Sequence, residues 1–211
     1  MSQPPYPYPV ALIFGAPGAG KGTQCDILKR VPGFFHLSSG TIFRHLDPAS
    51  ANAKTARDYS HRGELVPDEL TTQIVFDWLE AQRRDGRFRP EQQLLLLDGI
   101  PRNRRQCTLI GPCFDVQIIL HLICRDEKVM MERIRRRASL ENRLDDVSDA
   151  VIHKRFEVYR NETVQVLDEY PAEIVHEVEP TLTPAEVLLT CLQYLVPLYT
   201  RRFPRDLSAV A

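Results

Sequence analysis

Short apolar runs recur along the chain and are separated by amphipathic or polar stretches. Mostly apolar runs at 10–14, 94–97 and 116–122 predict strands that are buried on both faces of a parallel sheet. The segments 34–37 and 172–178 predict two further strands. Because helical stretches alternate with these segments, the pattern predicts an α/β fold with a five-stranded parallel sheet flanked by helices.

The intervening stretches carry several kinds of helix signal. Leu70, Ile74 and Trp78 recur every four residues and form an apolar face. Thr183 and Glu186, with a proline directly after Thr183, form a capping box that opens a last helix. The polar stretch 47–63 indicates a small peripheral insert. Helices are predicted at 23–30, 38–44, 67–85, 126–137, 151–167 and 183–195.

Composition limits the classes of protein to consider. The chain has 211 residues, 43% of them apolar, which suits one globular domain with a good core. Its net charge of −1 does not favour binding to nucleic acid or to a membrane surface. No apolar run approaches the roughly 20 residues of a membrane span. The five cysteines form no CxxC pair, which indicates reduced thiols in a cytoplasmic protein rather than disulfides or zinc ligands.

A glycine-rich loop follows the first predicted strand. Residues 15–23 read GAPGAGKGT and lead directly into a helix, the context in which a phosphate-binding loop is expected. Glycines let backbone N–H groups turn inward around an anion, and Lys21 can reach the terminal phosphates. The general pattern expects a hydroxyl residue at position 22, but here it arrives at Thr23. A plain glycine turn between a strand and a helix is the alternative interpretation.

A second motif follows the strand at 94–97. Asp98 ends this strand and Arg102 lies shortly after it. An acid at the end of a strand beside a phosphate loop commonly holds Mg²⁺ through water. The chain has 22 Arg and only 5 Lys, and the forked guanidinium group suits contacts to phosphate oxygens. For most of these arginines, a compositional preference for Arg is the simpler explanation.

Five motifs in this order resemble the adenylate kinases, within the nucleoside monophosphate kinases. They are GAPGAGKGT followed by Gln24, SSG with Arg44, GELVPDE at 63–69, DGIPR at 98–102 with Gln106, and RLDD at 143–146. The resemblance covers the chain from Val10 to about Leu195. It implies a P-loop nucleoside triphosphate hydrolase-like fold and the reversible transfer of a phosphoryl group from Mg·ATP to AMP, giving two ADP.

The resemblance also implies a role for individual residues. ATP is expected at Gly18, Ala19, Gly20, Lys21, Gly22, Thr23, Arg133 and Arg137. AMP is expected at Ser39, Arg44, Glu64, Leu65, Val66, Gly99, Ile100, Pro101, Arg102, Gln106, Arg143 and Arg155. The catalytic groups are expected to be Lys21, Arg102, Arg137, Arg143 and Arg155, with Asp98 holding Mg²⁺ through water. Asp145 and Asp146 are expected to orient the arginines, and Gln106 to pair with an adenine edge.

The resemblance further implies how the chain is divided. The core is expected at 10–37, 67–137 and 147–198, with an NMP-binding insert at 38–66 and a short lid at 138–146. Residues 1–9 are expected to be a flexible proline-rich lead-in and 199–211 a tail. The short lid has no cysteines, and no zinc is expected in the protein. ATP and AMP are the expected partners of a cytoplasmic monomer that binds neither nucleic acid nor membrane.

Three positions depart from the family's pattern. Thr41 stands where members usually have an Asp that organises the waters around the metal, so weaker Mg²⁺ organisation is expected. Ser39 replaces a usual Thr. The spacing to Arg155 is one residue longer than in many members, which leaves Lys154 as the alternative for its role.

Two alternative functions stay open. One is a kinase with another acceptor, CMP or UMP, although members acting on pyrimidine nucleotides tend to carry Asn where Gln106 stands. The other is a nucleotide-binding homologue that transfers phosphate poorly. Thr41 is its only support, and the retained Lys21 and Asp98 argue against it.

Overall fold

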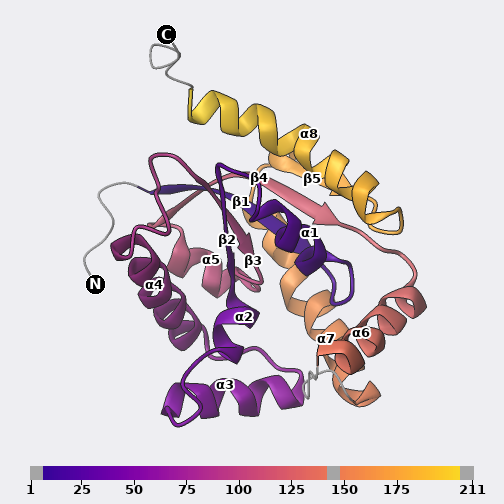
Figure 1. Ribbon diagram of the computed structural model, residues 1–211. Coiled ribbons are helices and arrows are strands. Elements are labelled where there is room, and N and C mark those ends of the chain that lie inside the picture. Colours follow the sequence, from indigo (N-terminus) through magenta and orange to yellow (C-terminus); the bar gives the residue numbers. More distant parts are fainter. Residues whose placement is uncertain (1–6, 142–147, 205–211) are drawn as a thin grey trace.

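The computed structural model describes residues 7–141 and 148–204. Its centre is a sheet of five parallel strands in the order β2-β3-β1-β4-β5 (Figure 1). Strands β2 and β3 lie on one side of β1, and β4 and β5 on the other, so the strand order reverses beside β1. Ligands bind at such switch points in parallel sheets. The strands are β1 (Tyr8–Gly15), β2 (Phe34–Ser38), β3 (Leu94–Asp98), β4 (Phe114–Leu122) and β5 (Val175–Val178).

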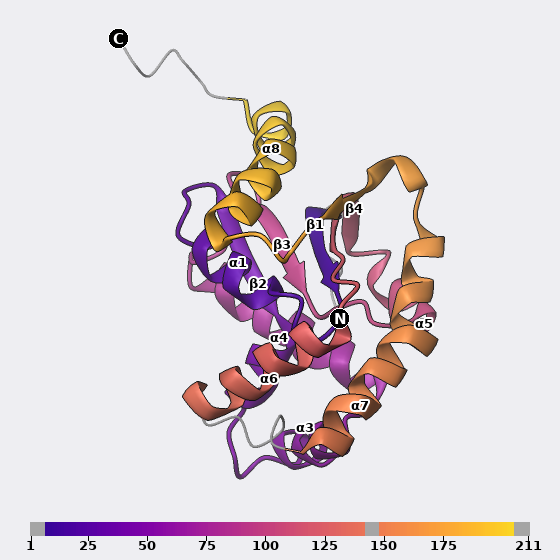
Figure 2. The same ribbon diagram turned by 90° about the vertical axis from the view of Figure 1, so that its right-hand side faces the viewer.

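Helices cover both faces of the sheet, so the predicted fold class is confirmed. Figure 2 shows α1 and α8 on one side of the sheet and α5 on the other. Helices α1 and α8 pack in one apolar core with Ala11 and Ile13, and α4 and α5 pack in a second core with Val10 and Leu12. The helices are α1 (Lys21–Leu28), α2 (Ser39–Arg44), α3 (Ala51–Arg62), α4 (Asp68–Arg84), α5 (Arg104–Ile110), α6 (Glu127–Glu141), α7 (Asp149–Val158) and α8 (Pro184–Arg202).

Strand β3 is buried on both faces. Leu94 and Leu96 pack in the first core, Leu95 and Leu97 pack in the second, and each of the four is at most 1% exposed. Because neither face meets water, every position of the strand requires an apolar side chain, which explains the continuous apolar run. Asp98, the first polar residue, ends the strand.

Helix α8 runs to Arg202, past the predicted end at 195, and contains Pro197. A proline removes one backbone donor and usually ends or kinks a helix. Here Leu198 remains buried, and Tyr199 packs against Phe34 with 5.7 Å between ring centroids. The Tyr199 hydroxyl also donates to the Gln92 carbonyl. Tertiary packing therefore holds the last turns in helical form, whereas the predicted capping box at the start of α8 is confirmed.

The helix predicted at 151–167 changes type along its length. It is α-helical in Asp149–Val158, π-helical in Tyr159–Thr163 and 3₁₀-helical in Val164–Glu169. Hydrophobic spacing alone does not separate these types. Strand β5 is also shorter than predicted, because Ala172–Ile174 forms a 3₁₀ turn before it.

Parts of the predicted division lie outside the described residues. Helix α6 continues through Glu141, so the first part of the predicted lid at 138–146 is helical. The remainder of the lid, residues 142–146, lies outside the described residues. So do residues 1–6 of the proline-rich lead-in and residues 205–211 of the tail. Within the described part of the chain, no helix combines the length and apolar character needed to cross a membrane.

Candidate active site

A cavity of about 1020 Å³ opens at the carboxyl ends of the strands. Its walls come from the glycine loop, α1, α2, α3, α6 and α7, and both ribbon views place α3, α6 and α7 at one end of the molecule (Figures 1 and 2). Arg143, Asp145 and Asp146 lie outside the described residues. The other predicted site residues all line the cavity: Gly18, Ala19, Gly20, Lys21, Gly22, Thr23, Ser39, Arg44, Glu64, Leu65, Val66, Asp98, Gly99, Ile100, Pro101, Arg102, Gln106, Arg133, Arg137 and Arg155.

Two glycines shape the turn between β1 and α1. Gly15 and Gly18 have φ angles of 144° and 80°, which residues with side chains disfavour. A Cβ atom at either position would lie 2.5 Å from a backbone oxygen of a neighbouring element. Helix α1 then begins at Lys21 on the cavity wall, where its first N–H groups and the positive end of its dipole favour an anion. This geometry is that of a phosphate-binding loop.

Lys21 folds back over this loop. Its Nζ donates to the carbonyl oxygens of Gly15 at 2.7 Å and Ala16 at 3.0 Å. Burial lowers the pKa of Lys21 to about 8, while Asp98 opposes the shift and Arg102 adds to it. A lysine in this position neutralises an arriving phosphate at little cost, because the cation is already removed from bulk water.

We expect the affinity for Mg·ATP to depend on pH through Lys21. The protonated amine of Lys21 attracts phosphate, and bound phosphate in turn raises the pKa of this amine. Above the pKa of the free protein, the amine is neutral and must take up a proton when Mg·ATP binds. Affinity should be constant below pH 8 and fall about tenfold per pH unit above it. Calorimetric titration from about pH 7 to 9.5 measures this. A Lys21→Arg variant, which stays charged, should show a flat profile; a flat profile in the unmodified protein would contradict the expectation.

Arg102 projects into the cavity from the loop after β3. Its Nε donates to the Gly99 carbonyl at 2.8 Å, which holds the guanidinium plane in place. Burial lowers the pKa of Arg102, Asp98 opposes this shift, and Arg155 and Arg44 add to it as neighbouring cations. Several positive charges therefore gather around Arg102, an arrangement that favours a phosphate group.

Helix α7 distinguishes Arg155 from the alternative Lys154. Arg155 lines the cavity, whereas Lys154 Nζ pairs with Glu157 at 3.0 Å on the exposed surface. Helix α6 brings Arg133 and Arg137 to the cavity wall together with Arg136, which the sequence interpretation did not include. The structure thus adds Arg136 as a candidate phosphate contact and supports Arg155 over Lys154.

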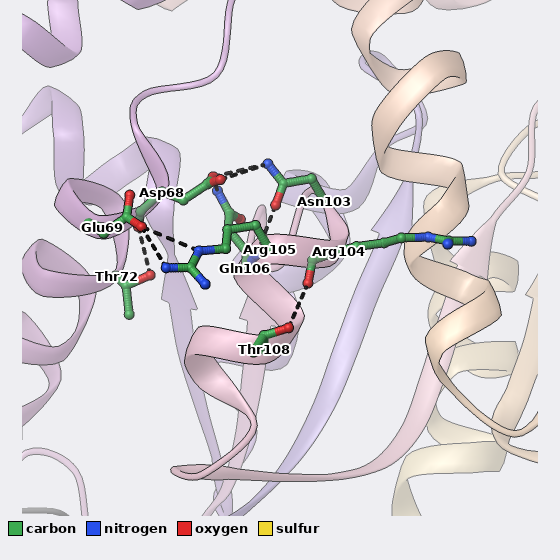
Figure 3. A network of polar contacts seen from close by, with 8 residues as sticks. All are labelled: Asp68, Glu69, Thr72, Asn103, Arg104, Arg105, Gln106 and Thr108. Carbon is green, nitrogen blue, oxygen red and sulfur yellow. Dashed lines mark hydrogen bonds and ion pairs between the residues drawn. The ribbon is translucent and has the colours of Figure 1, made fainter.

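The amide of Gln106 is held at both ends, and Figure 3 shows Asp68, which holds one of them, together with Asn103. Its Oε1 accepts from the Arg102 backbone N–H at 2.7 Å, and its Nε2 donates to Asp68 Oδ1 at 2.8 Å. Asp68 also accepts from Asn103 Nδ2, at 3.0 and 3.2 Å to its two oxygens. Gln106 is 1% exposed, so this network fixes which end of the amide carries the oxygen. Asp68 belongs to a motif visible in the sequence, but its contact with Gln106 needed the fold.

Asp98 suits a magnesium ion by its donor atoms. Its side chain is 13% exposed and lines the cavity, and it acts on the charges of Lys21 and Arg102. Mg²⁺ in nucleotide sites takes one or two carboxylates, phosphate oxygens and several waters. A single carboxylate beside a phosphate loop fits this requirement.

Known proteins share this sequence pattern. The sequence model of the family described as adenylate kinase matches residues 13–175. The chain is 37% identical over 169 residues to an adenylate kinase of Synechococcus sp. (strain WH7803). The aligned region covers 76% of this chain and 84% of that relative. The chain is also 36% identical over 166 residues to one of Thermobifida fusca (strain YX), covering 75% and 82%. The glycine loop, the cluster around Arg102 and this similarity agree: the chain belongs to the adenylate kinase family.

Proposed function

We propose that the protein catalyses the reversible, Mg²⁺-dependent transfer of the γ-phosphoryl group of ATP to AMP, giving two ADP. One observation carries this proposal: a single cavity is lined both by the phosphate loop with Lys21 and by a second set of groups, Arg44, Arg102 and Gln106. The cavity therefore offers two nucleotides separate anion-binding subsites that face one space. Family membership supports the same reaction.

The residues act by positioning and by neutralising charge, which phosphoryl transfer requires more than an acid or a base. The N–H groups at the start of α1 hold the ATP phosphates, and Lys21 exchanges its loop carbonyls for the transferred group. Arg44 and Arg102 hold the AMP phosphate in line. Mg²⁺, held through water by Asp98, neutralises charge on the ATP phosphates when bound.

The arginines of the cavity wall complete this charge. Arg133, Arg137 and Arg155 lie on α6 and α7, and we propose that Arg143 of the intervening segment joins them when the site closes. Asp145 and Asp146 are proposed to orient these arginines. Closure excludes water, which keeps ATP from being hydrolysed.

Gln106 is proposed to select adenine at the acceptor subsite. After its contacts with Arg102 and Asp68, the amide retains one hydrogen and one lone pair. These match N1 and the exocyclic amino group of adenine, an acceptor beside a donor. Because the network fixes the amide, the same pair presents the wrong order to a uracil edge.

The orientation of Gln106 is expected to depend on Asp68. An Asp68→Ala variant should raise the KM for AMP about tenfold, because the amide loses the partner that fixes its orientation. The KM for ATP should stay unchanged. An Asp77→Ala variant is the control, since Asp77 lies exposed on the same helix and accepts a hydrogen bond from Gln73 Nε2. Equal changes in both KM values would contradict this role.

The reaction itself is tested most simply with ADP alone. Incubation of the protein with Mg²⁺ and ADP should yield ATP and AMP in equal amounts. ³¹P nuclear magnetic resonance measures both products. Formation of AMP and inorganic phosphate without ATP would indicate hydrolysis of ADP and contradict the proposal.

Thr41 is expected to weaken the organisation of Mg²⁺. Thr41 lines the cavity and its hydroxyl accepts a hydrogen bond from Arg44 Nη2 at 3.2 Å, so it offers the metal's waters no charge. A Thr41→Asp variant should lower the Mg²⁺ concentration needed for half-maximal rate by roughly a few-fold. Thr41→Asn, which has the same shape without the charge, is the control. An unchanged Mg²⁺ dependence in Thr41→Asp would contradict this interpretation.

We also propose that the protein acts as a monomer in the cytoplasm, without nucleic acid or membrane partners. One chain supplies all the site residues in the described ranges. The five cysteines lie in those ranges and are free thiols, which suits a reducing compartment. Analytical ultracentrifugation measures the oligomeric state.

A further inference from the structure

Three metal-binding side chains meet beside the phosphate loop, from three different elements. The Cys25 thiol, a His36 ring nitrogen and an Asp98 carboxylate oxygen all lie within 4.8 Å of one another. Cys25 comes from α1, His36 from β2 and Asp98 from the end of β3. Among the residues that the structure describes, no other group of three or more His, Cys, Asp or Glu side chains brings its ligand atoms this close together.

The sheet register explains why they meet. His36 pairs with Leu96 in the parallel β2–β3 ladder, so both side chains lie on the same face. Asp98 follows Leu96 by two positions and therefore shares that face. Leu96 and Cys25 belong to the same apolar core, because α1 covers this side of the sheet.

The cluster is buried and leaves a polar atom unsatisfied. Cys25 is 0% exposed, and the side chains of His36 and Asp98 are 10% and 13% exposed. The His36 Nε2 atom is inaccessible to solvent and has no hydrogen-bond partner within residues 7–141 and 148–204. Its distance of 3.9 Å to Asp98 Oδ2 is too long for a hydrogen bond. An unpaired buried nitrogen is rare in proteins and calls for an occupant.

The donor atoms specify the kind of occupant. Sulfur and imidazole nitrogen favour Zn²⁺ and similar thiophilic ions, whereas Mg²⁺ prefers oxygen alone. Three protein ligands with a fourth open position make a common zinc arrangement. Donor atoms around tetrahedral zinc lie roughly 3.5 Å apart, so small side-chain rotations bring these three into range.

We propose that Cys25, His36 and Asp98 form a binding site for a thiophilic divalent cation, represented by Zn²⁺, at the floor of the ATP subsite. Burial raises the pKa of the Cys25 thiol well above its usual range, so binding must displace the thiol proton, which leaves to solvent. From the sequence alone we expected none of the five cysteines to bind zinc, and the proposal departs from that expectation at Cys25.

Occupation of this site has a consequence for the proposed reaction. Asp98 is the residue proposed to hold Mg²⁺, and a zinc-bound carboxylate is no longer available for that role. Zinc should therefore inhibit phosphoryl transfer. This consequence rests on the proposed function, whereas binding of the metal does not.

The test is a titration of the nucleotide-free protein with Co²⁺, followed by competition with Zn²⁺. A thiolate-to-cobalt charge-transfer band in the near ultraviolet, lost on addition of Zn²⁺, is expected in the unmodified protein. A Cys25→Ala variant should lose the band and bind Zn²⁺ at least about 100-fold more weakly. Cys107→Ser is the matched control, because Cys107 lies in the other core region and its thiol contacts the Asn103 carbonyl; it should keep the band.

Absence of the band from the unmodified protein, or its persistence in Cys25→Ala, would overturn the proposal. Thermal melting establishes that each variant is folded. If Cys25→Ala does not fold, His36→Gln decides, since it should weaken Zn²⁺ binding by more than about tenfold, and unchanged affinity refutes the site. Binding without inhibition would leave the metal site intact and contradict only the role of Asp98 in the reaction.

Discussion

Replacing Lys21 with methionine should lower the turnover of ATP and AMP by on the order of 10³-fold. The lysine amine lies over the loop at 2.7 Å from the Gly15 carbonyl, a contact that it is proposed to exchange for the transferred group. Methionine preserves most of the length of the side chain but places no charge beside the transferred group. The loss should fall mainly on kcat, because charge on that group changes most in the transition state. Steady-state kinetics with both substrates measures this.

Lys29→Met is the matched control for this variant. Lys29 lies just past the other end of α1, is exposed and pairs with Asp26, so its loss should leave turnover unchanged. Turnover within about threefold of the unmodified protein in Lys21→Met would contradict the assignment of the loop to the transferred phosphate.

Replacing Arg102 with lysine should lower kcat/KM for AMP by about 10²-fold while leaving the KM for ATP nearly unchanged. The Arg102 Nε is committed to the Gly99 carbonyl, which directs the remaining guanidinium N–H groups toward the cavity. Lysine keeps the charge but cannot make a forked contact while also holding Gly99. The expected loss corresponds to one charge-assisted hydrogen bond of about 1.5–3 kcal/mol.

Arg105→Lys serves as the control for this second variant. Arg105 is exposed on the neighbouring helix and pairs with Glu69 at 2.9 Å, so its change should have little effect. If Arg102→Lys affects the two substrates equally, the acceptor-side assignment of Arg102 is wrong.

The fold was predictable because strands β1 and β3 are buried on both faces. Leu94–Asp98 shows the reason: four leucines face two cores, and the first acid marks the end of the strand. The phosphate loop was predictable for a similar reason, since the φ angles of Gly15 and Gly18 leave few other residues possible. Such positions carry their structural constraint in the residue type itself.

Other features depend on contacts between distant segments and were not predictable. The continuation of α8 through Pro197 depends on the packing of Tyr199 against Phe34. The contact of Asp68 with Gln106 joins residues that are 38 positions apart. No spacing rule connects such pairs.

The cluster of Cys25, His36 and Asp98 was also not predictable from the sequence. Cys25 and His36 lack any ligand spacing in the sequence, and the cysteines were interpreted as plain thiols. Only the pairing of β2 with β3 and the packing of α1 bring them to Asp98. Local patterns therefore identify loops and buried strands, while side-chain clusters between elements require the fold.

The most direct test of the proposed function is a coupled assay of ADP formation from Mg·ATP with AMP, CMP, UMP or GMP as acceptor, with Lys21→Met as the blank. We predict rapid, Lys21-dependent turnover with AMP and little with the other three acceptors. Turnover with UMP or GMP would preserve the mechanism and contradict the role of Gln106. Turnover with CMP, whose base has the same donor and acceptor order as adenine, would contradict only the specificity for AMP. Binding of both nucleotides without turnover would contradict the proposed phosphoryl transfer and favour a nucleotide-binding homologue that transfers phosphate poorly.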